Sequence, residues 1–172
     1  MSRHIELNPT NHVTVGTIGP PGQRTFYLQG SRGIDVVSLI IEKQQASILA
    51  RSLESLLSEL SIKYPREGHE EAHNPVMDMR LRQPVEPLFR VGNMGLGYNE
   101  DIDRVVLVAY ELVDDEEEPN VVSFWITRAQ VKVVAHHALE VVKAGRPICG
   151  NCGRPIEVDG IHFCPQRNGH IV

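Results

Sequence analysis

Hydrophobic residues change their spacing along the first third of the chain, from short continuous runs to helical steps. Residues 13–15, 25–29 and 36–41 are apolar or β-branched runs separated by glycine-rich turns, and they predict three strands. Residues 43–62 then carry apolar side chains at steps of three and four, which predicts a helix that stops before Pro65. Its apolar face consists of Ala46, Leu49, Leu53, Leu56, Leu57 and Leu60.

The same order of patterns returns in the second half of the chain. Residues 91–95, 104–108 and 121–126 predict three more strands, and a helical pattern follows them. Thr127 and Gln130 have the spacing of a capping box, so we expect this helix to begin at Thr127. Its apolar face consists of Val131, Val134, Ala135, Ala138, Val141 and Val142.

The two halves also resemble each other residue by residue. Residues 36–57 align without gaps on residues 121–142, and the alignment coincides with the change from strand to helix in both halves. The identical pairs are Val36/Val121, Val37/Val122, Ser38/Ser123, Ile41/Ile126, Gln45/Gln130 and Ala50/Ala135. A three-stranded sheet with one helix buries little surface, whereas two such units can share a core. We therefore expect an internal duplication.

The predicted fold class is α+β. Two β-β-β-α repeats form one antiparallel sheet or a half-open barrel with two helices on it, and a zinc-ribbon-like hairpin follows at the C-terminus. The expected boundaries are residues 1–64 for the first repeat, 65–87 for a polar, proline-containing connecting loop, 88–145 for the second repeat and 146–172 for the hairpin.

The strongest chemical signal lies near the C-terminus. All three cysteines of the chain, Cys149, Cys152 and Cys164, lie within 16 residues, and His162 stands beside the last of them. Three thiolates and an imidazole are the ligands of a closed, tetrahedral structural zinc site, with no position left open for a substrate. His170 is a competing fourth ligand, although His162 shares a short segment with Cys164. An iron–sulfur cluster is less favoured, because a histidine would have to replace a cysteine.

A second candidate site consists of four cations at similar places in the two halves. Arg24 and Arg104 precede or begin predicted strands, while Lys43 and Arg128 lie at the starts of the two predicted helices. A helix N-terminus with cations around it favours an anion. The sequence leaves two alternatives open: these side chains bind a small anionic ligand between the repeats, or they pair with nearby carboxylates.

Other motifs favour ordinary structural roles. The H-E-E-A-H stretch at residues 69–73 has the spacing of zinc peptidases, but its proline- and glycine-flanked context is not that of a buried helix. His136 and His137 fit a partly exposed pair on a helix. The G-T-I-G-P-P-G stretch at residues 16–22 lacks the Lys-Ser/Thr ending of a phosphate-binding loop and predicts a hairpin turn.

Charge and cysteine usage limit the kinds of partner and compartment. The net charge of −5 argues against the general basic surface that nucleic-acid binding requires. No apolar run approaches the roughly 20 residues needed to span a bilayer, and no signal peptide is readable at the N-terminus. An odd number of closely spaced cysteines favours a metal site in a reducing compartment. We expect a cytoplasmic protein with no membrane association.

Several segments together resemble an uncharacterised bacterial family with a domain of unknown function of about this length. They are V-G-T-I-G-P-P-G-Q-R-T-F-Y-L-Q, E-K-Q-Q, F-R-V-G-N-M-G-L, A-G-R-P-I-C-G-N-C-G-R-P and H-F-C-P-Q-R-N-G. The resemblance implies no activity. It implies that the family's cysteine pair and H-x-C motif correspond to Cys149, Cys152, His162 and Cys164. The place of His170 is typically aromatic in the family, which weakens His170 as a ligand.

These features predict a non-enzymatic, zinc-containing binding or adaptor protein. The zinc would be structural, and the arginines beside it, Arg146, Arg154 and Arg167, would help the hairpin to recognise a partner protein, with nucleic acid possible but not favoured. The alternative is an enzyme or sensor that binds a small anion between the repeats. A third possibility is a homo-oligomer formed through exposed apolar residues such as Met77, Met94 and Leu96.

Overall fold

The computed structural model describes residues 2–20, 22–66 and 78–144. The described part contains seven strands and two helices. The strands are β1 (His4–Leu7), β2 (His12–Ile18), β3 (Thr25–Arg32), β4 (Asp35–Ile41), β5 (Pro87–Asn99), β6 (Arg104–Glu111) and β7 (Val121–Ile126). The helices are α1 (Lys43–Lys63) and α2 (Arg128–Ala144).

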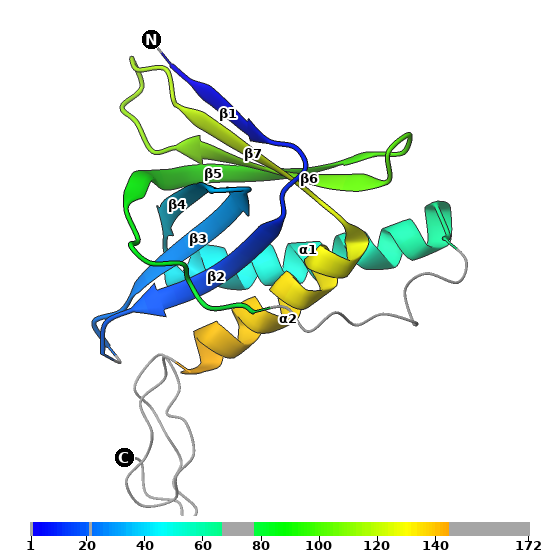
Figure 1. The fold of residues 1–172 in the computed structure, drawn as a ribbon, viewed down its shortest axis with the longest axis horizontal. Coiled ribbons are helices and arrows are strands. Elements are labelled where there is room, and N and C mark those ends of the chain that lie inside the picture. Colours follow the sequence, from blue (N-terminus) through cyan, green and yellow to red (C-terminus); the bar gives the residue numbers. More distant parts are fainter. Residues whose placement is uncertain (1, 21, 67–77, 145–172) are drawn as a thin grey trace, which may run out of the picture.

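The strands form one open, mixed sheet in the order β1-β7-β6-β5-β4-β3-β2 (Figure 1). β4 pairs with β5, and β1 with β7, in parallel, while the other neighbours are antiparallel. The predicted α+β class is confirmed, but the prediction of an antiparallel sheet is wrong. The reason is the long connection through α1, because a crossover of this length returns the chain beside β4 in the same direction.

The two edge strands of the sheet are neighbours in sequence, since β1 and β2 are separated by residues 8–11 alone. The amide of Thr10 donates to the carbonyl of Trp125 in β7 at 3.0 Å, and the amide of Asn11 donates to Ser31 in β3 at 2.8 Å. The linker is therefore hydrogen-bonded to both ends of the sheet. The sheet curls so that its two ends approach each other at this linker.

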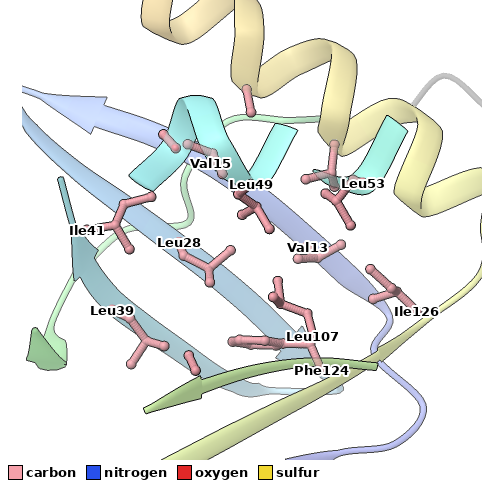
Figure 2. Close-up of a cluster of buried hydrophobic side chains, with 14 of the residues drawn as sticks. Val13, Val15, Leu28, Leu39, Ile41, Leu49, Leu53, Leu107, Phe124 and Ile126 are labelled. Carbon is pink, nitrogen blue, oxygen red and sulfur yellow. The ribbon is translucent and has the colours of Figure 1, made fainter. Parts of the chain in front are cut away.

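Both helices pack on one side of the curled sheet and lie side by side (Figure 1). Leu49 and Leu53 of α1 point into the same apolar cluster as Leu28 of β3 and Phe124 of β7 (Figure 2). The predicted apolar faces are confirmed: four of the six residues expected on α1 are buried, and Leu56 and Leu57 pack partly buried against them. On α2 the buried members are Val131, Val134, Ala135 and Ala138.

The connection from α1 to β5 crosses β2 and β3. The hydroxyl of Thr14 donates to the carbonyl of Met79 at 2.7 Å, and the Gln29 side chain bonds the amide and the carbonyl of Arg82. Gly16 permits the close approach, because a Cβ atom there would lie 2.5 Å from Cγ of Leu81. Residues 78–83 are thus fixed to the sheet rather than forming a free loop.

The two halves use corresponding strand registers. In the first half, Phe26 of β3 pairs with Ile41, which lies two residues before the first residue of α1. In the second half, Val105 of β6 pairs with Ile126, which lies two residues before the first residue of α2. Phe26 therefore corresponds to Val105. By the same register, Lys43 corresponds to Arg128.

Each helix is also tied to the other half by a glutamine at the same position. Gln45 accepts from the amide of Glu42 at 2.7 Å and donates to the carbonyls of Val91 and Gly92. Gln130 accepts from the amide of Thr127 at 2.8 Å and donates to the carbonyls of Thr10 and Asn11. The two glutamines thus connect the halves reciprocally, and the predicted cap at Thr127 is confirmed by a second bond, from the Gln130 amide to the Thr127 hydroxyl at 3.1 Å.

The other predicted strands and both predicted helices are also confirmed, with α1 ending one residue later than expected and α2 beginning one residue later, while the predicted C-terminal hairpin lies outside the described residues. β1 was not predicted, because four residues of alternating exposure give too short a pattern to separate from a loop. None of the helices in the described part of the chain could cross a membrane.

Candidate functional site

The start of α2 is a closed network around Arg128. This side chain is 6% exposed, and its Nε donates to Oδ1 of Asp103 at 2.9 Å. Its Nη2 donates to the carbonyl of Tyr64 at 2.6 Å and to the hydroxyl of Tyr98 at 3.0 Å. The guanidinium also lies 5.6 Å from the centre of the Tyr98 ring. Arg128 thus joins the end of α1, the start of α2 and the β5–β6 hairpin.

The electrostatics of this network favour the ionised pair. Burial alone would raise the pKa of the Asp103 carboxyl, but hydrogen bonds from Tyr98 and Arg128 lower it below its usual value. Burial would likewise lower the pKa of Arg128, but the bonds to Tyr98 and Asp103 raise it. Arg66 adds a weaker contact, with its Nε 3.6 Å from Oδ2 of Asp103. The positive charge at the start of α2 is therefore balanced within the protein.

The start of α1 lacks this balance. Lys43 corresponds to Arg128, and the residue that corresponds to Asp103 is Arg24, because each lies two residues before the paired strand positions Phe26 and Val105. A cation thus replaces the carboxylate. Nε of Arg24 is buried without a hydrogen-bond partner, and neither the Arg24 nor the Lys43 side chain has a hydrogen bond or ion pair within residues 2–20, 22–66 and 78–144.

Arg24 and Lys43 line one cavity of about 410 Å³ at the β2–β3 turn. The cavity is also lined by the apolar residues Phe26, Ile40 and Ile41, and by a third cation, Arg90 of β5. Nη1 of Arg90 lies 2.7 Å from Oε1 of Glu42, which also lines the cavity, so one of the three cations is paired. The formal side-chain charge around the cavity is three positive and one negative, or +2.

The profile of the family "Protein of unknown function (DUF3090)" matches residues 5–164. The chain belongs to this family. No curated protein and no solved structure matches the chain. The DUF3090 match spans nearly all of the sheet, both helices and the Cys/His segment up to Cys164, so the cavity and the predicted metal ligands both lie within the part that this family shares.

The four cations predicted from the sequence do not gather at one place in this DUF3090 protein. Arg24 and Lys43 line the cavity, whereas Arg128 is enclosed in the Asp103 network. Nη1 of Arg104 donates to the carbonyls of Ile102 and Asp103 at 3.1 and 3.0 Å. The sequence alignment of Arg24 with Arg104 is off by one residue, since the strand register aligns Arg104 with Thr25.

Sequence reasoning missed Arg90. It lies 47 residues after Lys43 along the chain, and only the parallel pairing of β4 with β5, which sets Arg90 beside Ile40, brings it to the cavity. The F-R-V-G-N-M-G-L segment carried the resemblance to the family, but nothing in its pattern indicated that Arg90 joins a cation cluster.

The predicted zinc ligands Cys149, Cys152, His162 and Cys164 lie outside the described residues, as do His170 and the H-E-E-A-H stretch. Within the described ranges, no group of three or more His, Cys, Asp or Glu side chains could hold a metal ion. His137 of α2 is half-buried beside residues 78–83, and burial lowers its pKa.

Proposed function

We propose that this protein is a binding protein for a small anionic ligand, held in the cavity at the start of α1. The observation that carries the proposal is the difference between Arg24 and Asp103 at corresponding positions. In the second half a carboxylate neutralises the helix-start cation, whereas in the first half two cations share the cavity. Like charges destabilise each other unless an anion lies between them. A bound anion would give Arg24 and Lys43 the negative charge that Asp103 gives to Arg128.

Arg90 can contribute to binding without a large cost. Its side chain and that of Glu42 are 49% and 65% exposed, and such exposed ion pairs contribute only about 0–1 kcal/mol. An incoming anion can therefore compete with Glu42 for the guanidinium. Arginine forms two parallel hydrogen bonds with carboxylate or phosphate groups, which suits Arg24 and Arg90 as ligand-binding residues.

The test is to titrate the full chain with phenyl phosphate and to measure the dissociation constant by isothermal titration calorimetry. Arg24→Gln and Lys43→Gln should each weaken binding about 10- to 100-fold, because charge-assisted hydrogen bonds contribute roughly 1.5–3 kcal/mol. Arg104→Gln is the matched control: it removes the same charge from the second half and should leave affinity unchanged. Equal losses in all three variants would show a nonspecific effect of net charge and would contradict the proposal.

A C-terminal structural zinc site is the second part of the proposal. Cys149, Cys152, His162 and Cys164 form a donor set that suits tetrahedral zinc. The family match ends at Cys164, and thus includes these four residues and leaves out His170. Bound zinc would fix this segment in one fold, and the arginines at 146, 154 and 167 could then present a rigid basic surface to a protein partner.

Metal analysis of protein purified without added metal should give about one zinc per chain. Cys149→Ser and His162→Ala should each lower the zinc content, while His170→Ala serves as the matched histidine control and should not. Unchanged zinc in Cys149→Ser would refute the site. A pull-down that compares the full chain with one ending at Gly145 tests the adaptor role separately, since loss of partners on truncation would assign recognition to the C-terminal segment.

We also infer that the two halves arose by duplication of one β-β-β-α unit. The shared register and the reciprocal bonds of Gln45 and Gln130 support this origin. In that account the ancestral unit had one polar site at its helix start. The second copy filled this site with a carboxylate, and the first copy kept it for a ligand.

A further inference from the structure

We infer that the ligand of the cavity is a phosphate monoester in its dianionic form. This inference rests on the proposed anion site and narrows its chemistry. Arg24, Lys43 and Arg90 carry three positive charges and Glu42 one negative charge, so a ligand of charge −2 neutralises the cavity and a monoanion does not. A phosphate monoester carries about −1.5 to −2 at neutral pH, concentrated on a single group with three acceptor oxygens.

The lining of the cavity favours one compact dianionic group over two separate carboxylates. Arg24 precedes β3, Lys43 begins α1 and Arg90 lies in β5, so residues from three elements line one cavity. The volume of about 410 Å³ lies in the range of small-molecule pockets, roughly 300–1,000 Å³. The apolar residues Phe26, Ile40 and Ile41 also line the cavity and can contact the organic part of an ester.

The pH dependence of binding distinguishes a dianion from a monoanion. The second pKa of a phosphate monoester is about 6. None of the described residues that line the cavity is a histidine, and its titratable groups are Arg24, Lys43, Arg90 and Glu42. A change of affinity near pH 6 that a permanently monoanionic ligand does not show would therefore report the charge of the ligand.

The experiment compares four aromatic anions by calorimetry with the full chain between pH 5 and pH 7.5. Phenyl phosphate should bind about tenfold tighter at pH 7.5 than at pH 5. Benzenesulfonate keeps one negative charge throughout this range, so its affinity should be weaker and independent of pH, and benzoate should behave likewise. Phthalate, a dicarboxylate, should bind at least tenfold more weakly than phenyl phosphate at pH 7.5.

The outcomes separate this inference from the proposed site. If benzenesulfonate or phthalate binds as tightly as phenyl phosphate, and Arg24→Gln weakens it, the anion site stands and the phosphate inference is wrong. A flat pH profile for phenyl phosphate also overturns the inference. If none of the four anions binds in an Arg24-dependent way, the proposed site itself fails.

Discussion

At the start of α2, a buried arginine is held by a carboxylate, a tyrosine and the carbonyl of Tyr64. At the corresponding start of α1, a lysine and an arginine share a cavity with a third cation. The backbone framework around both sites is alike, down to the glutamine in the first turn of each helix. The difference shows that the same framework can surround either an ion pair that fastens the two helices or a group of cations with a net positive charge.

Removal of the cation at the start of each helix should reveal the largest difference in stability between the two halves. Arg128→Met should cost about 3–5 kcal/mol, because it removes the buried cation that pairs with Asp103 and the donor to the Tyr64 carbonyl at the end of α1. Lys43→Met, the matched change in the first half, should alter stability by less than about 0.5 kcal/mol. Urea unfolding of both variants measures the difference. Equal losses would mean that Lys43 is also structural.

Asp103→Asn should have the next largest effect. At neutral pH the variant should lose about 2–3 kcal/mol, since Arg128 keeps only a neutral partner there. The folded pKa of Asp103 lies below its unfolded value, so its contribution is present above about pH 3.9 and is lost as the pH falls through the folded pKa. The stability curves of wild type and variant should therefore converge in acid. Parallel curves from pH 7 to pH 2 would argue against an ion pair.

Substitution of either glutamine should cost less stability than substitution of Arg128 or Asp103. Gln45→Ala and Gln130→Ala should each cost about 1–2 kcal/mol, because each side chain makes a cap bond and two bonds to the other half. The losses should be similar, and guanidinium unfolding can compare them. A loss confined to Gln130 would show that the reciprocal connection is unequal and would weaken the inferred duplication.

The sequence predicted the elements well because each depends on local spacing. The step from a continuous apolar run at residues 36–41 to spacings of three and four marked the strand–helix boundary within a residue. The sequence did not predict the features of the sheet that depend on pairing between distant strands. The parallel contact of β4 with β5 and the pairing of β1 with β7 have no signal in residue spacing.

The candidate site was predicted in part for the same reason. Helix starts are readable from sequence, so Lys43 and Arg128 were identified as equivalent, and they are. Arg24 was aligned with Arg104 by their shared residue type, and only the strand register shows that Asp103 is its counterpart. Because both residues are arginines, the sequence alignment is shifted by one position. The shift hides the fact that the counterpart of Asp103 in the first half is a cation.

The central claim is that Arg24 and Lys43 form a ligand site because the first half lacks the carboxylate of the second. The most direct test is to introduce that carboxylate into the first half. Arg24→Asp provides Lys43 with the carboxylate that Asp103 provides to Arg128. The free energy of unfolding of wild type and variant should be measured with and without phenyl phosphate at ten times its wild-type Kd. We predict a gain of about 1.4 kcal/mol for wild type, no gain for Arg24→Asp, and a ligand-free variant at least as stable as wild type. An equal gain in both proteins would contradict the claim that Arg24 and Lys43 form a ligand site.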